Sequence, residues 1–196
     1  HIDCDHIAGA CEGIAKVDAE VLQRTVKKII FNTSEKIQKE ILVSKKNGEY
    51  GVGEGIEFWK ILKEKGIYDR ITERTVAGEI INLSGGALLK VISPGEKELD
   101  KLLDKWETYE KKHMPVGYSP NLEQVKQNLN DLMRSPTGTD NSVNNASSIA
   151  FLFEYQDVKG AFLGDAKTSV CMEGLKKFDI KDVYPIDFIK LSHHGS

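Results

Sequence analysis

The chain opens with His1-Ile2-Asp3-Cys4-Asp5-His6-Ile7-Ala8-Gly9-Ala10, and the rest of the sequence is interpreted from this segment. Four potential metal ligands fall within six positions: His1, Asp3, Asp5 and His6. If these residues form a strand, side chains 1, 3 and 5 point to one side, because side chains of a strand alternate with a period of two. A turn after position 5 would bring His6 round to join them. The small residues that follow allow a helix, residues 8–17, to start close behind the ligands.

Two further polar clusters follow apolar runs later in the chain. Gly164-Asp165 comes after Phe162-Leu163, and His193-His194 comes after the run at residues 188–191. Four of the five histidines lie in the first or the last of these blocks, at positions 1, 6, 193 and 194. Polar groups at the ends of strands in an α/β sheet lie where separate loops can converge. The sequence therefore predicts one site that combines these three blocks.

The first block resembles the His-x-His-x-Asp-His signature of the metallo-β-lactamase superfamily, with Asp3 in place of the second histidine. The variant His-x-Asp-x-Asp-His-Ile-x-Gly resembles a subgroup near the ComEC competence proteins. Residues 145–153 with Gly164-Asp165 are similar to that subgroup's Asn-x-Ser strand and Gly-Asp unit, and His193-His194-Gly195-Ser196 is similar to its last motif. The resemblance implies an α/β fold, a metallo-β-lactamase-like four-layer αββα sandwich.

The resemblance also implies two divalent metal ions. His1 and Asp3 would hold one ion, Asp5 and His6 would hold the other, and Asp165 would bridge the two. Such a pair can activate a water and neutralise the charge that develops on a substrate. A carboxylate at position 3 makes the first ion's site harder than an imidazole would, which shifts its preference from zinc towards manganese, iron or magnesium.

Three residues carry catalytic roles by the same resemblance. One of His193 and His194 would complete the second ion's site, and the other would act as a general acid or hold a phosphate oxygen. Asp5 would also orient the attacking water. The superfamily usually has another histidine before the bridging aspartate, and His113 is the only candidate here. Its context, Lys-Lys-His-Met-Pro, favours a solvated loop, so water could complete the first ion's site.

The resemblance implies a metal-dependent hydrolase that acts on phosphoester or phosphodiester substrates, either small molecules or nucleic acid. The net charge of −3 gives no general attraction to nucleic acid and weakens that part of the prediction. Two alternatives stay open, because fold does not select a substrate. One is a hydrolase of a small ester, thioester or amide, and the other is a degenerate metal-binding sensor or scaffold module.

Composition and length favour one globular domain across residues 1–196, with 40% hydrophobic and 29% charged residues. Because the chain opens inside a motif, we expect it to be incomplete at both ends and to belong to a larger chain or complex. No apolar run approaches the roughly 20 residues that cross a bilayer. Three cysteines without paired spacing favour a reducing, cytoplasmic location. Residues 113–145, rich in proline and polar residues, predict a long loop or insertion that either closes over the site or is disordered.

Hydrophobic periodicity and turn residues predict the remaining elements. Strands are expected at residues 26–31, 147–155, 160–163 and 188–191, and a hairpin at residues 76–83 and 87–92 around Ser84-Gly85-Gly86. Helices are expected at residues 35–43, 55–65, 96–112 and 168–178. The helix at 96–112 carries an apolar stripe at helical spacing: Leu99, Leu102, Leu103, Trp106 and Tyr109.

Overall fold

The computed structural model describes residues 1–33, 52–72, 74–110, 142–180 and 183–191. In these ranges the chain has a mixed α/β fold, with one five-stranded sheet of order β1-β2-β3-β4-β5. The strands are β1 Ile80–Asn82, β2 Leu88–Ser93, β3 Ala150–Tyr155, β4 Val158–Phe162 and β5 Phe188–Lys190. The helices are α1 Cys4–Lys16, α2 Ala19–Thr25, α4 Val52–Glu64, α5 Glu96–Glu110, α7 Val143–Ala146 and α8 Thr168–Leu175, with the 3₁₀ helix η1 Tyr68–Arg70.

The sheet is mixed, because β1 to β4 pair antiparallel and β5 pairs in parallel with β4. The predicted hairpin is confirmed: β1 and β2 are joined by a turn in which Gly85 and Gly86 have φ of 91° and 89°. Glycine adopts these positive φ values without steric cost. The parallel pair needs a crossover connection, and α8 lies in the chain between β4 and β5 and provides it.

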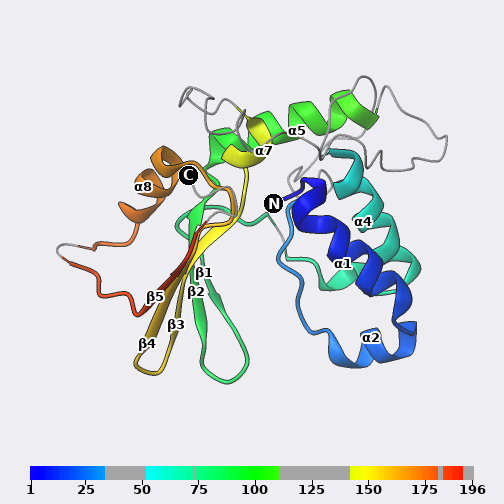
Figure 1. Cartoon of the computed structure of the whole chain (residues 1–196), viewed down its shortest axis with the longest axis horizontal. Helices are drawn as coiled ribbons and strands as arrows, with labels where there is room; N and C mark the ends of the chain where they lie inside the picture. Colours follow the sequence, from blue (N-terminus) through cyan, green and yellow to red (C-terminus); the bar gives the residue numbers. More distant parts are fainter. Residues whose placement is uncertain (34–51, 73, 111–141, 181–182, 192–196) are drawn as a thin grey trace, which may run out of the picture.

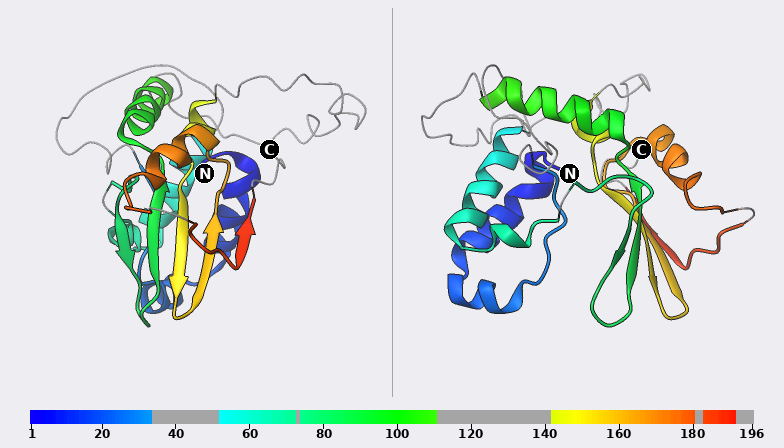
Figure 2. Two further views of the ribbon diagram at one scale, coloured as in Figure 1. Left: turned by 90° about the vertical axis from the view of Figure 1, so that its left-hand side faces the viewer. Right: turned by 180° about the vertical axis from the view of Figure 1, so that it is seen from behind.

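The two faces of the sheet carry different neighbours, as Figures 1 and 2 show. On one face Val91 and Phe151 belong to an apolar cluster that also includes Ile30, from the segment that follows α2. On the other face Leu152 and Ala161 belong to a cluster that includes Cys171 of α8. Residues paired across neighbouring strands share a face, which is why each of these two pairs stays together.

A third cluster forms the core between the helices. It contains Ile7 of α1, Leu62 of α4 and three residues of α5: Leu99, Leu102 and Trp106. Each of the three residues of α5 is at most 1% exposed. These three belong to the stripe that periodicity predicts, so that prediction is confirmed for them. In Figures 1 and 2, α5 lies across the ends of both the sheet and the helices α1 and α4, and so it connects the two parts.

The strand predicted at residues 26–31 is wrong. The segment makes one isolated parallel bridge, between Ile29 and Ile71. Its side chains alternate between two clusters: Ile29 and Phe31 pack with the helices, and Ile30 packs against the sheet. The β-branched residues therefore fill the space between two layers instead of pairing in a sheet. Asn32 then fixes the end of the segment, because its side chain bonds both Thr75 N, at 2.8 Å, and Thr75 O, at 2.9 Å.

Other predictions have mixed outcomes. The helix expected at residues 55–65 starts three residues earlier, at Val52, and its predicted terminator Gly66 has φ of 67°. The helix expected at 35–43 and most of the long loop at 113–145 lie outside the described residues, and the loop's described end contains α7. None of the helices described is both long and apolar enough to cross a membrane.

Candidate metal site

The N-terminal block folds differently from the predicted strand and turn. Helix α1 starts at Cys4, and the backbone oxygen of Asp3 accepts hydrogen bonds from His6 N at 2.9 Å and Ile7 N at 3.0 Å. Asp3 is thus the N-cap, a position that aspartate favours, and Asp5 lies in the first turn, where the helix dipole favours a carboxylate. The strand prediction is wrong because these residues form the first turn of a helix, where the helix dipole favours the carboxylate of Asp5, and a short alternation of polar residues does not outweigh this.

The helical turn still brings the two histidines of the block together, and Asp165 joins them. The ring centroids of His1 and His6 lie 4.5 Å apart. Asp165 Oδ2 lies 2.8 Å from His6 Nε2 and 3.8 Å from His1 Nε2. The side chains of His1 and Asp165 are each 2% exposed. One ligand atom from each of the three residues lies within 4.8 Å of the other two.

Asp165 follows β4 and is held by its neighbours. The backbone N–H of Asp165 donates to Ser148 Oγ at 3.1 Å, and Ser148 is fully buried. Gly164 has φ of 54°, and a side chain there would collide with Ser148. Ser148 lies in the block that resembles the metallohydrolase subgroup, but its contact with Asp165 was not part of the sequence prediction.

Asp3 is held through both of its carboxylate oxygens. Asp3 Oδ2 lies 3.0 Å from His1 Nε2, and Asp3 Oδ1 accepts a hydrogen bond from Asn144 Nδ2. Lys105 Nζ in turn donates to Asn144 Oδ1 at 3.2 Å. Burial alone would raise the pKa of Asp3, but the hydrogen bond and charge of His1, the hydrogen bond from Asn144 and the charge of Lys105 lower it.

The donors present fit a divalent cation. Two imidazoles and carboxylates are the ligand types that zinc and manganese take, and ligands about 2.1 Å from an ion at tetrahedral angles lie about 3.4 Å apart. His6 Nε2 and Asp165 Oδ2 lie 2.8 Å apart, and one ring nitrogen of His1 lies within 4.8 Å of a ligand atom of each, so small shifts of the side chains would reach that separation. In addition, His1 Nδ1 is buried with no hydrogen-bond partner among the described residues. Burying a polar atom without a partner is costly, and a cation bound at His1 Nδ1 would offset that cost while His1 Nε2 keeps its hydrogen bond to Asp3.

The predicted site residues therefore fall into three groups. His1, His6 and Asp165 lie together, and Asp3 contacts His1. Asp5 is exposed and is not one of the three residues of the cluster. His193 and His194 lie outside the described residues. Among the described residues, one group of three potential ligands lies close together. The site of the second ion stays a prediction.

Two residues near the cluster were missed by sequence reasoning. Lys105 contacts Asn144, and Asn144 contacts Asp3. In the sequence, 141 positions separate Asn144 from Asp3. Lys105 lies inside a correctly predicted helix, but no local pattern relates either residue to the first block. Only the folded chain shows this connection.

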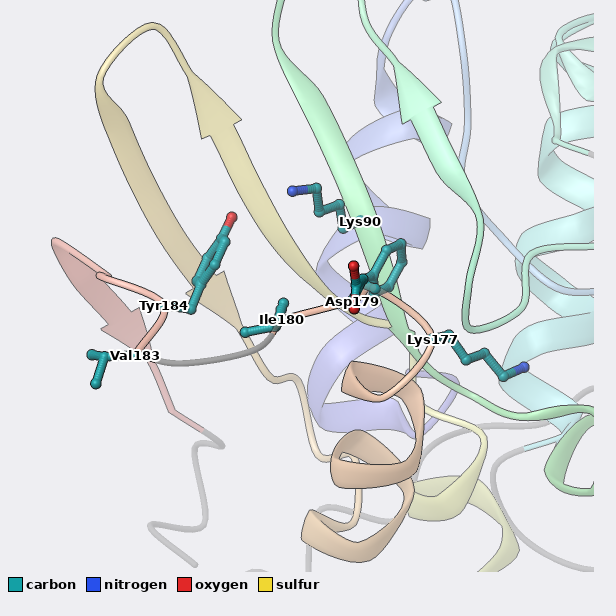
Figure 3. A pocket seen from close by; sticks show the side chains of 7 residues that line it. Lys90, Lys177, Asp179, Ile180, Val183 and Tyr184 are labelled. Atoms are coloured by element: carbon teal, nitrogen blue, oxygen red, sulfur yellow. The ribbon is translucent and has the colours of Figure 1, made fainter.

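Two hollows lie on the sheet face that carries α8, and neither includes a residue of the cluster. One of about 530 Å³ is shown in Figure 3 and contains Lys90, Asp179 and Tyr184 in its lining. The other, of about 520 Å³, is mostly apolar and lies between α8 and the strands. Lys90 is paired with Glu154 at 2.5 Å. The site at His1, His6 and Asp165 is therefore separate from both hollows.

Comparison of the chain with protein-family models, with curated proteins and with solved structures finds no match. The functional interpretation therefore depends on the geometry of the cluster and on the motifs of the sequence.

Proposed function

We propose that the protein is a metal-dependent hydrolase of the metallo-β-lactamase type, which acts on phosphoester or phosphodiester substrates. One observation supports this most strongly: His1, His6 and Asp165 converge in space from blocks 159 positions apart. The same three residues were selected from the sequence by their chemistry and by the resemblance. Two of their side chains are almost completely buried, and a buried cluster of ionisable groups is a candidate for a functional site.

In this proposal the protein's own residues have separate tasks. His1, His6 and Asp165 would hold one divalent ion, and Asp3 would hold the His1 ring in place. A bound divalent ion can supply Lewis-acid polarisation of a phosphoryl oxygen and lower the pKa of water. The exposed carboxylate of Asp5 would orient the attacking water. For a second ion, zinc, manganese, iron or magnesium, we propose Asp5, Asp165 and one of two histidines as ligands: His193 or His194.

The finer description of the fold belongs to the same proposal. The described sheet, with α8 on one face, would form two layers of an αββα sandwich. We also propose a reducing, cytoplasmic location, because the three cysteines of the sequence show no paired spacing. A cytoplasmic enzyme could meet either small phosphoesters or nucleic acid.

A second candidate function is a metal-binding sensor or scaffold module. The described residues favour it in one respect, because they supply a single cluster of three ligands and not a pair of adjoining clusters. Such a module would bind an ion at His1, His6 and Asp165 without turnover of a substrate.

A metal-dependent screen separates these functions. The purified protein, with manganese, zinc or magnesium, is assayed on bis(p-nitrophenyl) phosphate, p-nitrophenyl phosphate and p-nitrophenyl acetate. We expect the protein to turn over the phosphodiester. A chelator should abolish this activity, and Asp165→Asn should lack it. Asp157→Asn, at the exposed turn between β3 and β4, is the matched control and should keep full turnover. Metal binding without turnover would favour the sensor module, and turnover that survives both the chelator and Asp165→Asn would contradict the proposal.

A further inference from the structure

A chain of hydrogen bonds runs from α5 through α7 to the candidate metal site. Lys105 Nζ donates to Asn144 Oδ1 at 3.2 Å, and Asn144 Nδ2 donates to Asp3 Oδ1. The other oxygen of Asp3 lies 3.0 Å from His1 Nε2. Figure 1 shows α7, which carries Asn144, beside α5 near the N-terminal end of the chain. Residues from three separate elements are thus connected to one imidazole of the cluster.

The chemistry of the two end groups, Lys105 and Asp3, fixes the direction in which each hydrogen bond of this series is donated. A lysine ammonium can only donate hydrogen bonds, and an ionised carboxylate can only accept them. The amide of Asn144 lies between the two, so its carbonyl must face Lys105 and its amino group must face Asp3. Asn144 is 4% exposed, and a reversed amide would leave its buried groups facing partners of the wrong kind. Lys105 and Asp3 together therefore determine which way the Asn144 amide points.

The position of Asp3 in the helix supports a role at the site. Asp3 is the N-cap of α1, but its side chain makes no capping hydrogen bond. A capping bond of aspartate typically contributes about 1 kcal/mol to stability. Instead, both carboxylate oxygens are directed to partners at the cluster, Asn144 and His1.

We propose that Asn144 and Lys105 are positioning residues for the metal site: they fix the Asp3 carboxylate, and through it the His1 imidazole, in the orientation that binds the ion. This inference rests on the proposed function. Residues that orient a metal ligand typically change metal affinity by about 10- to 100-fold when they are replaced. A network with only a structural role, joining α5 and α7 to α1, would change stability and leave the metal affinity as it is.

The test compares two pairs of variants. Asn144→Ala removes the donor to Asp3, and Asn82→Ala makes the same change at an exposed position of β1. Lys105→Met removes the ammonium, and Lys101→Met makes the same change one turn earlier on the exposed face of α5. Lys105→Arg keeps a cationic donor and serves as the rescue. Dissociation constants for manganese and cobalt are measured by calorimetry, and the visible spectrum of the cobalt-loaded protein reports the geometry of the ligands.

We expect Asn144→Ala to weaken metal binding by about 10- to 100-fold and to change the cobalt spectrum. Lys105→Met should weaken binding less, Lys105→Arg should restore it, and both controls should bind as the wild type does. If Asn144→Ala fails to fold by circular dichroism, the three lysine variants decide the question. Wild-type affinity and an unchanged spectrum in both Asn144→Ala and Lys105→Met would overturn the positioning role and leave the proposed metal site intact. A wild-type protein that binds neither metal would overturn the proposed function and the positioning role together.

Discussion

Gly164 is the residue on which the placement of Asp165 depends. Its φ of 54° lies in the left-handed region, which residues with a side chain rarely adopt. A Cβ atom there would lie 2.6 Å from Ser148 Oγ and 3.3 Å from the backbone oxygen of Ile149. Ser148 Oγ is the same atom that accepts the hydrogen bond from Asp165 N. A side chain at position 164 would therefore displace the group that holds the candidate ligand.

We expect Gly164→Ala to lower the free energy of unfolding by about 1–3 kcal/mol and also to weaken metal binding. The control is Gly85→Ala in the β1–β2 turn, where φ is 91° but no atom lies within 4 Å of the new Cβ. That variant should lose stability through backbone strain alone and keep its metal affinity. Urea denaturation and metal titration of both variants check this. Equal metal affinity in Gly164→Ala and Gly85→Ala would show that Gly164 does not position the site.

The residues of the cluster could be predicted from sequence, but their supports could not. Two histidines within six positions, and an aspartate after an apolar run, are local patterns, and the structure brings His1, His6 and Asp165 together. The hydrogen bond from Asn144 to Asp3 joins residues 141 positions apart and leaves no local pattern. The backbone of the first block was also mispredicted, because a short polar alternation fits both a strand and a capped helix start.

Among the elements, α8 shows how closely a helix can approach the sheet. A Cβ atom on Gly174 would lie 1.9 Å from the backbone oxygen of Ile92, which lies at the bulge of β2. Glycine inside a helix costs about 1 kcal/mol relative to alanine. Its presence in α8 is explained by this contact between the two backbones, which leaves no room for a methyl group.

We expect Gly174→Ala to push α8 away from β2 and to lower the free energy of unfolding by about 3 kcal/mol, although alanine is the better helix former. Ser169→Ala, at an exposed position of the same helix, should change it by no more than about 0.5 kcal/mol. Urea denaturation of the two variants measures the difference. A Gly174→Ala protein as stable as Ser169→Ala would mean that α8 does not pack on β2 at this position.

An ion pair and a hydrogen bond that share the carboxylate of Glu154 connect β2, β3 and the segment before β5. Figure 3 shows two of the three side chains, Lys90 and Tyr184. Lys90 Nζ lies 2.5 Å from Glu154 Oε1, and the hydroxyl of Tyr184 donates to the same oxygen. Burial alone would raise the pKa of Glu154, but the hydrogen bonds from Lys90 and Tyr184 and the charges of Lys90 and Lys159 lower it. For Tyr184, burial and the contact with Glu154 raise the pKa.

Because the pKa of Glu154 is lower in the folded protein, its ionised form stabilises the fold above the unfolded pKa of about 4.3. That stabilisation is lost as the pH falls through the lower, folded pKa. We expect the wild type to be more stable than Glu154→Gln at about pH 6 and the difference to shrink at about pH 3. Thermal melts of both proteins at the two pH values measure this. A difference that stays constant between them would show that the Glu154 carboxylate does not contribute through its charge.

The elements were predictable where the pattern was local. The β1–β2 hairpin and the buried stripe of α5 follow from a Gly-Gly turn and from a period of 3.6 residues. The segment at residues 26–31 was mispredicted because β-branched residues suit any extended segment with both sides buried. The parallel pairing of β5 with β4, by contrast, depends on a crossover that no local pattern specifies.

At the scale of the whole molecule, the cluster joins two layers of the fold. His1 lies just before α1 and His6 lies in its first turn, and α1 packs beside α4, whereas Asp165 follows β4 of the sheet. A cation bound by all three residues would therefore tie the helical layer to the sheet. A ligand that binds only the folded protein raises its stability by an amount set by its concentration relative to the dissociation constant.

The most direct test is whether His1, His6 and Asp165 form one divalent-cation site. Purified protein, first treated with a chelator, is titrated with manganese and with zinc while binding heat and melting temperature are recorded. At an ion concentration about 100-fold above the dissociation constant, we expect the wild type and Asp157→Asn to gain about 2.7 kcal/mol and to melt roughly 5–10 °C higher. Asp165→Asn should bind weakly and show almost no shift. An equal shift in Asp165→Asn, or no binding of either ion by the wild type, would contradict the proposed site.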